Sequence, residues 1–538
     1  MQDRFISLLY PDEASQIFHQ DAANLPDISE TVCDELGLTD LFNLKSSSLC
    51  DYFTSDERVI SYRQQTMADM LAGPSLNETL SKVHPILDDI RELYRLDTDK
   101  GGGESYLYGI TAIELYVSCI DVLKEGFLPI KDDVKSPAFR SLVDFLLEIA
   151  DSEYYKELNE KLSDLTARVH EVKSVTIGVN LDRELRPCSA GVISVNSETF
   201  KSGKAHDKIQ RFSFKNDAFT TIAELSPLSK GQSDNKKEAL IAAFHSAIED
   251  VFKSSVRGWK AIVGEYVLDS TDFLLKLLPE IEFVSKSAEL IKRLAAHEGC
   301  AICTPTVAPM SEKAFCAKGL YNPRVAMAID EPIVTNDRSL DDSGRIYVLT
   351  GPNRGGKSVI TVALGAAEAM MMLGLPVPAE SAVISAVDGI YTHFPEGADD
   401  TIDKGRLGEE CARLREIFDS VSADSMVLLD ESLSSTGAYE ASYIASEILT
   451  GFAVIGARGI FSTHLHELAA AVPEINAKSA ERGGVSVDTL VAGMEEGERS
   501  FKITRAKPDG KSYARDIADK YGLSFDSLIK RHEGGADE

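Results

Sequence analysis

Residues 345–358 read RIYVLTGPNRGGKS, and they predict how the C-terminal half of the chain folds. The first part, residues 346–350, is apolar and β-branched, which suits a buried parallel strand. The second part has the phosphate-binding spacing of a glycine, four further residues and then Gly-Lys-Ser. In such a loop the backbone N–H groups surround a phosphate, and the positive end of the next helix, predicted over residues 359–373, faces the anion. The predicted phosphate-binding residues are Gly351, Pro352, Asn353, Arg354, Gly355, Gly356, Lys357 and Ser358.

A second apolar strand supplies the acidic partner that a phosphate loop needs. Residues 426–431 read MVLLDE, so Asp430 and Glu431 come at the carboxyl edge of a buried strand, where ligands bind in open α/β sheets. Asp430 is predicted to hold Mg²⁺ together with Ser358, while Glu431 orients or deprotonates the water that attacks the γ-phosphate. These residues predict ATP and Mg²⁺ as ligands, with Lys357 and Glu431 as catalytic groups.

The charge composition of the chain limits which macromolecules it can bind. Lys plus Arg number 56 and Asp plus Glu number 86, so the formal net charge of −30 excludes non-specific coating of DNA or an anionic membrane. Residues 199–237 are locally basic, with eight basic and four acidic side chains. They form either a patch for a phosphate backbone or an ordinary solvated loop. The candidate DNA contacts in this patch are Lys201, Lys204, Lys208 and Arg211.

The chain has no apolar run of about 18 residues and no cleavable leader, which predicts a cytoplasmic protein without a membrane partner. Its eight cysteines are mostly scattered and do not resemble a disulfide framework. Cys300 and Cys303 form a CxxC near His297 and Cys316, which raises zinc binding as an alternative. Because a second CxxC pair is missing, reduced cysteines near a packed strand are favoured.

Hydrophobic periodicity divides the chain into five parts. Helical spacing covers residues 56–96, 106–123 and 137–173, then alternation predicts strands from residue 174, and helical spacing returns over 238–297. From residue 304 to near 505 strands and helices alternate, which indicates an α/β domain with a largely parallel sheet. The predicted domains are an N-terminal segment (1–55), a helical core and lever (56–173), a β-rich clamp-like insertion (174–237), a helical lever return (238–303) and an ATPase domain (304–538).

These motifs resemble the MutS family of DNA mismatch-repair ATPases. The resemblance rests on LTGPNRGGKS at 349–358, LLDES at 428–432 and STHLHEL at 462–468, with KGLYNP at 318–323 and VTND at 334–337 as its pre-loop segments. Looser matches are Arg63 and Gln64, similar to the family's "RQ", and KSYARDIADKYG at 511–522. The resemblance implies an ABC-type P-loop ATPase domain behind a mostly α-helical core. It also implies that His464, like the histidine of ABC-type ATPases, contacts the γ-phosphate as a third catalytic residue.

Three departures from the family pattern change what we expect. Residues 432–437 replace the family's Gly-Arg-Gly-Thr-Ser-Thr run, and residues 404–409 lack a clear counterpart of the serine that contacts nucleotide across the dimer. Fewer than 60 residues precede the helical core, and the only Phe-x-Glu, at 394–396, lies inside the ATPase domain. We therefore expect a member without the mismatch-recognition domain.

The favoured interpretation is a homodimeric ATPase that uses ATP at the dimer interface to control its engagement with double-stranded or structured DNA in repair or recombination. Binding would follow DNA structure and not a mismatch wedge, and a repair protein would be a further partner. The alternative is a nucleotide-gated protein-interaction scaffold that does not bind DNA. A third possibility, ATP as a structural ligand with little hydrolysis, follows from the altered signature region.

Overall fold

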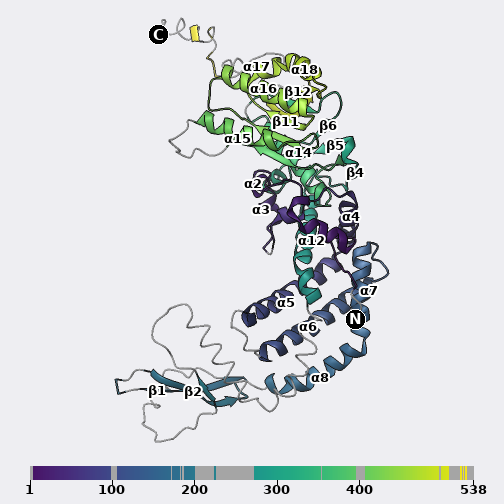
Figure 1. The fold of residues 1–538 in the computed structure, drawn as a ribbon, viewed down its shortest axis with the longest axis vertical. Coiled ribbons are helices and arrows are strands. Elements are labelled where there is room, and N and C mark those ends of the chain that lie inside the picture. The colour runs from purple at the N-terminus through teal and green to yellow at the C-terminus, as the bar shows by residue number, and fades with distance from the viewer. Residues whose placement is uncertain are drawn as a thin grey trace, which may run out of the picture. The chain divides into compact units, whose positions relative to one another are not determined.

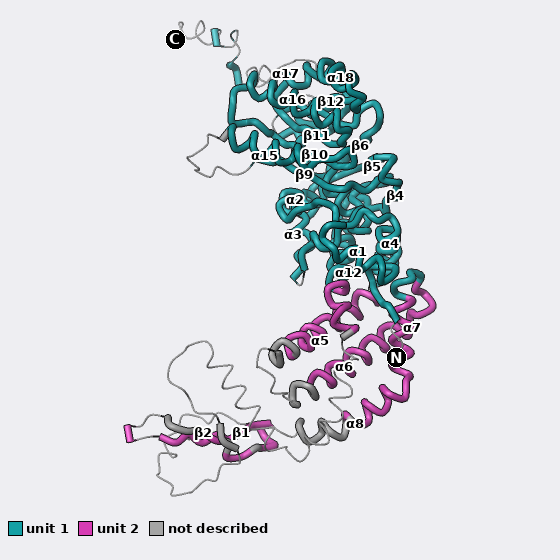
Figure 2. The backbone as a smooth tube through the Cα atoms, viewed as in Figure 1, with its two compact units in different colours: residues 1–73, 135–139, 282–538 teal, residues 74–134, 140–281 magenta. Residues whose placement is uncertain are grey.

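The computed structural model describes residues 4–45, 47–98, 106–170, 173–181, 183–184, 187–199, 223–225, 272–352, 354–395, 406–495, 498–507, 521–523, 525 and 528–529. The chain divides into two compact units (Figure 2). The first comprises residues 1–73, 135–139 and 282–538, and the second comprises residues 74–134 and 140–281. The division into five domains stays a prediction. The two units group the residues differently, because the first unit contains both the N-terminal segment and the α/β half.

The first unit contains a six-stranded sheet in the order β13-β12-β7-β11-β10-β9. Two of its strands, β11 and β12, are labelled in Figure 1. Its strands are β7 (Ile346–Thr350), β9 (Ile390–His393), β10 (Met426–Asp430), β11 (Arg458–Ser462), β12 (Val487–Glu495) and β13 (Glu498–Arg505). All neighbours pair in parallel except β12 and β13. This confirms the predicted largely parallel sheet. In register, Leu349 lies opposite Ser462 and Ser462 lies opposite Asp430, so β7, β11 and β10 end at one edge.

Helices cover this sheet, and every residue of β7, β10 and β11 is buried. Such strands read as continuous apolar runs because neither face meets water. The helices are α14 (Lys357–Met372), α15 (Arg406–Ser420), α16 (Ala438–Ile455), α17 (His466–Ala470) and α18 (Val472–Ala480). At Gly365 of α14 an added Cβ would lie 2.5 Å from Leu428 of β10 and 2.6 Å from Leu36. The helix that leaves the phosphate loop therefore packs tightly on both sides.

The first unit contains a second sheet that the sequence did not reveal. It has the order β4-β8-β5-β6, with β4 (Thr306–Ala308), β5 (Phe315–Leu320), β6 (Asn336–Leu340) and β8 (Ser381–Ser385). The β5 strand pairs antiparallel with both β6 and β8. The short elements η4 (Met310–Glu312) and α13 (Pro323–Ala328) lie between these strands in the chain. Local alternation identifies a strand but not its partners, so the sequence could not separate the two sheets.

The N-terminal segment packs on the α/β half of the chain, although its sequence pattern carried no such signal. Its elements are α1 (Glu13–Gln20), η1 (Ala22–Asn24), α2 (Glu30–Glu35), α3 (Leu38–Phe42) and η2 (Leu49–Tyr52), and α4 (Glu57–Ala72) follows at the start of the predicted helical core. Asp27 forms a parallel bridge with Gly389 beside β9, and its carboxylate accepts a hydrogen bond from the Tyr391 hydroxyl at 2.9 Å. Glu35 and Arg413 of α15 form an ion pair at 2.7 Å. The segment therefore covers the β9 edge of the sheet.

Arg63 and Gln64 of α4 make structural hydrogen bonds to distant segments. Arg63 is 2% exposed, donates through Nε to the Leu9 carbonyl at 3.2 Å and lies over the Tyr10 ring. Gln64 donates to the Pro305 carbonyl at 3.0 Å. Both residues join segments that are far apart in the chain, which gives them a packing role.

The second unit is mostly helical. Its elements are α5 (Pro74–Thr98), α6 (Tyr106–Phe127), η3 (Leu128–Ile130), α7 (Pro137–Asp151), α8 (Glu153–His170), β1 (Ser174–Leu181), β2 (Pro187–Asn196) and β3 (Ala223–Leu225), and α7 and α12 (Asp272–Ala296) contribute residues to both units. The prediction of one helix over residues 137–173 was wrong. The helix stops at Asp151 because the Ser152 hydroxyl donates to the Ile149 carbonyl at 2.6 Å and caps α8 by accepting from Tyr155 N at 3.1 Å.

The predicted β-rich insertion contains a three-stranded sheet in which β1 pairs antiparallel with β2, and β2 with β3. The basic residues Lys201, Lys204, Lys208 and Arg211 lie outside the described residues. Within the described part of the chain, no helix combines the length and the apolar character needed to cross a membrane.

Candidate functional site

The loop between β7 and α14 has the backbone that its glycines allow. Gly351 has φ 145°, and a Cβ there would lie 2.6 Å from the Cβ of Ala492 on β12, so only glycine fits. Gly356 has φ 90° and directly precedes the first residue of α14. Arg354 has φ 61° and is exposed, whereas Asn353 lies outside the described residues. The loop therefore leads the chain from the end of a buried strand into a helix N-terminus.

Lys357 is the cation of this loop. The residue is 5% exposed, and its Nζ donates to the carbonyl oxygens of Gly351 at 3.2 Å and Pro352 at 3.3 Å. Its third partner is Glu431 Oε1, at 3.3 Å. The structure thus brings together the lysine of the phosphate loop and the glutamate that follows β10, as the spacing predicted.

Glu431 joins Lys357 to His464. Its other carboxylate oxygen, Oε2, lies 2.6 Å from His464 Nδ1. Glu431 has φ 47°, in the left-handed region that glutamate rarely adopts, and Leu433 follows with φ 63°. Backbone strain of this kind gathers where a side chain must be aimed. Lys357, Glu431 and His464, from the ends of three parallel strands, form one connected group.

Two hydrogen bonds hold this strained turn. Glu431 N donates to the Ser462 carbonyl at 2.8 Å, which ties the end of β10 to β11. The Ser432 hydroxyl lies 2.8 Å from Nδ1 of His393, which is 4% exposed at the end of β9. Burial, with the nearby Arg413 charge, lowers the pKa of His393 to about 4, so the imidazole is neutral at neutral pH. The sequence did not single out His393 or Ser432, because neither belongs to a phosphate-site motif.

Asp430 and Ser358 lie together as predicted. The Ser358 hydroxyl lies close enough to the Asp430 carboxylate to lower its pKa, and Asp430 is 4% exposed. Burial raises the pKa of Asp430 to about 6; the adjacent Glu431 adds to this rise, and the Ser358 hydroxyl and the Lys357 ammonium oppose it. Among the described residues, buried Asp430 Oδ1 has no hydrogen-bond partner. Serine and carboxylate oxygens suit Mg²⁺, and an unpartnered buried oxygen is where a cation would bind, so the residues fit the predicted metal.

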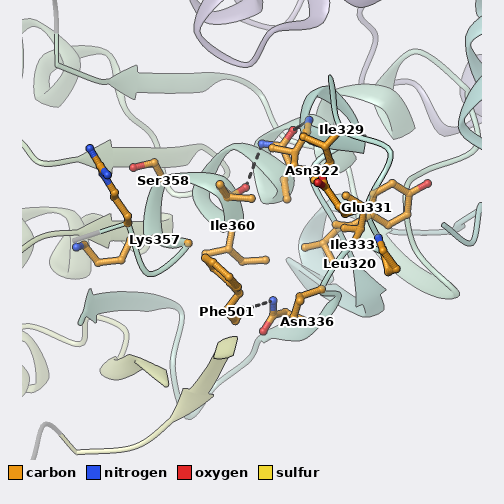
Figure 3. A pocket seen from close by; sticks show the side chains of 18 of the residues that line it. Leu320, Asn322, Ile329, Glu331, Ile333, Asn336, Lys357, Ser358, Ile360 and Phe501 are labelled. Atoms are coloured by element: carbon orange, nitrogen blue, oxygen red, sulfur yellow. Dashed lines mark hydrogen bonds between the residues drawn. The ribbon is translucent and has the colours of Figure 1, made fainter. Parts of the chain in front are cut away.

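A cavity of about 880 Å³ extends from this group along α14. In Figure 3, Lys357 and Ser358 lie at one end, and Leu320, Ile333 and Asn336 lie at the other. The pre-loop segments at 318–323 and 334–337 supply much of this far wall. The lining residues are Leu320, Tyr321, Asn322, Val325, Ile329, Glu331, Pro332, Ile333, Val334, Asn336, Arg354, Gly356, Lys357, Ser358, Val359, Ile360, Ala363, Glu431, His464 and Phe501.

Two asparagines hold the far wall in place. Asn322 caps α13 by accepting from Arg324 N at 2.8 Å, and its amide donates to the Val359 carbonyl of α14 at 3.2 Å. Asn336 accepts from Ile503 N at 2.8 Å and donates to the Phe501 carbonyl at 3.2 Å. Sequence reasoning missed Phe501, because β13 carries no motif that connects it to the phosphate loop.

The cysteine and histidine cluster offers little support for zinc. Cys300 Sγ lies 3.5 Å from His297 Nδ1, and His297 Nε2 lies 2.8 Å from the Ile329 carbonyl oxygen. In the described residues, no group of three or more His, Cys, Asp or Glu side chains is arranged to hold a metal ion. Cys316 is exposed on β5.

Two family models match most of the described chain. The model for MutS domain V matches residues 347–522, which include the phosphate loop, Glu431 and His464, and the model for the MutS2 N-terminal domain matches residues 55–297. The chain belongs to the MutS family. Its α/β half corresponds to MutS domain V.

Three curated MutS relatives illustrate the similarity. Endonuclease MutS2 of Thermus thermophilus is 30% identical over 200 residues, which are 37% of this chain and 26% of the relative. DNA mismatch repair protein MutS of Chlorobium limicola is 32% identical over 256 residues, 45% of this chain and 28% of the relative. DNA mismatch repair protein Msh3 of Mus musculus is 37% identical over 154 residues, 28% of this chain and 14% of the relative. The chain thus matches less than a third of the length of each of these MutS proteins.

Proposed function

We propose that this chain is a Mg²⁺-dependent ATPase whose ATP cycle controls its engagement with DNA in repair or recombination. The observation that carries the proposal is the meeting of Lys357, Glu431 and His464, from three strand ends, at one end of a large cavity. Phosphoryl transfer needs positioning and charge stabilisation more than covalent chemistry, and this arrangement supplies both.

The loop and Lys357 would bind the β- and γ-phosphates of ATP. A phosphate oxygen offers the Lys357 ammonium a stronger partner than the two loop carbonyls that it contacts. The largely apolar far end of the cavity suits the base of the nucleotide, since small-molecule sites combine apolar walls with a few polar anchors. ATP would therefore lie along α14, with its triphosphate at the helix N-terminus.

Ser358 and Asp430 would hold Mg²⁺ beside the phosphates. The bound ion would neutralise charge that develops on the phosphate oxygens. This chain's own task is to keep Asp430 ionised, and the Ser358 hydroxyl and the Lys357 ammonium both favour the ionised carboxylate. The bound cation would give Asp430 Oδ1 the partner that this oxygen otherwise lacks.

Glu431 would accept a proton from the attacking water or orient it, and His464 would contact the γ-phosphate. When a phosphate oxygen replaces Glu431 Oε1 as the partner of Lys357, that carboxylate oxygen becomes available to the water. His464 would then hold the other oxygen, Oε2, and keep the carboxylate aimed.

The DNA part of the proposal rests on family membership and on the basic residues of the 174–237 insertion. The names of the relatives refer to mismatch repair, which supports a nucleic-acid partner for this chain. Lys201, Lys204, Lys208 and Arg211 would contact phosphates without reading bases, so binding would favour distorted or branched DNA. We further propose that the protein is a cytoplasmic homodimer with ATP at its interface and that it recruits a repair protein.

Nucleotide binding and turnover test the enzymatic part. The protein and its Lys357→Ala and Glu431→Ala variants are titrated with ATP and Mg²⁺ and assayed for phosphate release. Loss of tight binding in Lys357→Ala, and retained binding without turnover in Glu431→Ala, are expected. Equal turnover in wild type and Glu431→Ala would refute the role of Glu431, and no turnover in any form would favour ATP as a structural ligand.

DNA binding is measured with homoduplex, mismatched, single-stranded and four-way-junction DNA at two salt concentrations, with and without ATP. Tight, salt-sensitive binding to a distorted structure, lost when the four basic residues become glutamate, is expected. In the matched control, glutamate replaces four exposed lysines elsewhere in the chain: Lys82, Lys131, Lys156 and Lys478. Absence of binding to every DNA at low salt would favour the nucleotide-gated protein scaffold, which the net charge of −30 also suits.

A further inference from the structure

Two cysteines of the N-terminal segment lie in direct contact. Cys33 in α2 is 1% exposed, Cys50 in η2 is half-buried, and their sulfur atoms are 3.7 Å apart. A disulfide needs two β-carbons about 3.8 Å apart and a sulfur–sulfur bond of about 2.05 Å, so thiols that already touch need only a small side-chain movement to form one. Among the described cysteines, this is the pair joined by a sulfur–sulfur contact.

A small cavity gives a reagent access to this pair. Its volume is about 210 Å³, and both cysteines line it beside apolar side chains that include Phe42 and Leu44. Glu30 and Asp34 also line it, so the cavity disfavours anionic reagents and admits small neutral ones. The cavity has ample room for a small neutral molecule such as a hydroperoxide.

The two thiols differ in reactivity. Contact with Cys33 and the hydroxyl of Ser48 lower the pKa of Cys50, against the opposing effects of burial and of the Glu30 and Asp51 carboxylates. The same contact and burial raise the pKa of Cys33. Cys50 is therefore the more readily ionised thiol of the pair, and thiolates are the species that oxidants attack.

We propose that Cys33 and Cys50 are a redox modification site that forms a reversible disulfide when the protein meets a hydroperoxide. With hydrogen peroxide as the oxidant, the Cys50 thiolate attacks one peroxide oxygen, the O–O bond breaks, and the other oxygen leaves as hydroxide and takes up a proton to become water. The Cys50 sulfenic acid is then attacked by the Cys33 sulfur, which loses its proton as the S–OH bond breaks and a second water leaves. With hydrogen peroxide, two thiols and one oxidant give one disulfide and two waters, and a dithiol reductant reverses the step.

The disulfide would cross-link the segment that packs against α14, the helix that follows the phosphate loop. It would join α2 to η2 across a separation of 17 residues. The residues that follow Cys33 make the contacts to the ATPase half: Glu35 pairs with Arg413, and Leu36 lies against Gly365 of α14. Oxidation would therefore restrict local opening of this covering segment, whether or not the proposed ATPase activity is correct.

Peptide mapping of the full-length protein tests the proposal. The reduced protein is treated with stoichiometric hydrogen peroxide, alkylated and digested with trypsin, whose cleavage after Lys45 separates the two cysteines. A linked Cys33–Cys50 peptide that disappears with dithiothreitol is expected. In the Cys33→Ser variant, Cys50 should be labelled by dimedone as a sulfenic acid. The matched control is Cys411→Ser, which changes another half-buried cysteine and should leave the linked peptide unchanged.

Thermal unfolding gives a second readout. Oxidation should raise the unfolding midpoint of the wild type by roughly 3–6 °C, because the bond closes a loop in the unfolded chain, and should not raise that of Cys50→Ser. Hydrogen exchange of residues 30–52 should slow on oxidation in the wild type. Absence of the linked peptide, pairing of Cys50 with another cysteine, or oxidation of Cys50 to a sulfinic acid while Cys33 stays reduced would each overturn the proposal.

Discussion

In the nucleotide-free protein, the free energy of unfolding of Asp430→Asn minus that of wild type should be larger at neutral pH than at acid pH. Asp430 is 4% exposed, and burial raises its pKa from the ordinary value of 3.8 to about 6. The folded protein therefore binds a proton more tightly than the unfolded chain does. A carboxylate with a raised folded-state pKa costs nothing below the unfolded pKa, and it costs most above the folded pKa.

The magnitude follows from the two pKa values. A difference of about 2 pH units at about 1.4 kcal/mol each gives a cost of about 3 kcal/mol above pH 6. Linkage gives a cost of about 1.6 kcal/mol near pH 5 and about 3 kcal/mol near pH 7.5. The asparagine side chain does not titrate, so it lacks this pH dependence. The free energy of unfolding of Asp430→Asn minus that of wild type should therefore rise by about 1.4 kcal/mol between those two pH values.

The assay is urea unfolding of both proteins near pH 5 and near pH 7.5, with EDTA present to remove divalent cations. Comparing the difference at two pH values cancels any pH-independent cost of placing an amide against Ser358. Asp342→Asn, on a side chain that is 97% exposed, serves as the control for removal of one negative charge. The same difference between Asp430→Asn and wild type at both pH values would refute the reasoning.

Three further substitutions test the site and its support. Glu431→Gln should retain ATP binding but slow single-turnover hydrolysis by about 100-fold or more, because the amide cannot accept the proton of water; unchanged turnover would contradict this. Glu368→Leu should cost about 3–5 kcal/mol in urea unfolding, because it leaves the Arg458 guanidinium, 2% exposed and 3.3 Å from the Glu368 carboxylate, buried without its counter-charge. Adding Arg458→Met should recover much of that loss, and a double variant no more stable than the single one would argue against the ion pair as the cause. Ser432→Ala should cost about 1 kcal/mol through the lost contact with His393 and lower the turnover number more than ATP affinity; a fall in affinity alone would contradict a role in positioning the turn at Glu431.

The local sequence was enough to predict that the residues of the candidate site lie together. Glycines at the two ends of the loop, four apolar residues before Asp430 and a strand before His464 each specify a short element whose end carries a functional group. Parallel strands place such ends at one edge, so Lys357, Glu431 and His464 were expected to meet, and they do. Alternation also predicted strands from residue 174, and β1 and β2 are found there as an antiparallel pair.

Other features depend on contacts between residues that are far apart in the chain. The strain at Glu431 is held by a serine of β11 and, through Ser432, by His393 of β9, and no spacing rule connects those positions. Ser152 ends a helix that periodicity alone would continue, because its hydroxyl competes for backbone groups.

The sequence by itself therefore predicted which residues gather at the candidate site, because each of them lies in a short motif with fixed backbone requirements. Only the tertiary structure decided what surrounds them: that Phe501 of β13 lines the cavity, that residues 1–73 belong to the same unit as the α/β half, and that Cys33 and Cys50 touch. The physical reason is that burial and pairing depend on the free energy of the whole packed unit, and a local pattern of apolar residues is compatible with many partners.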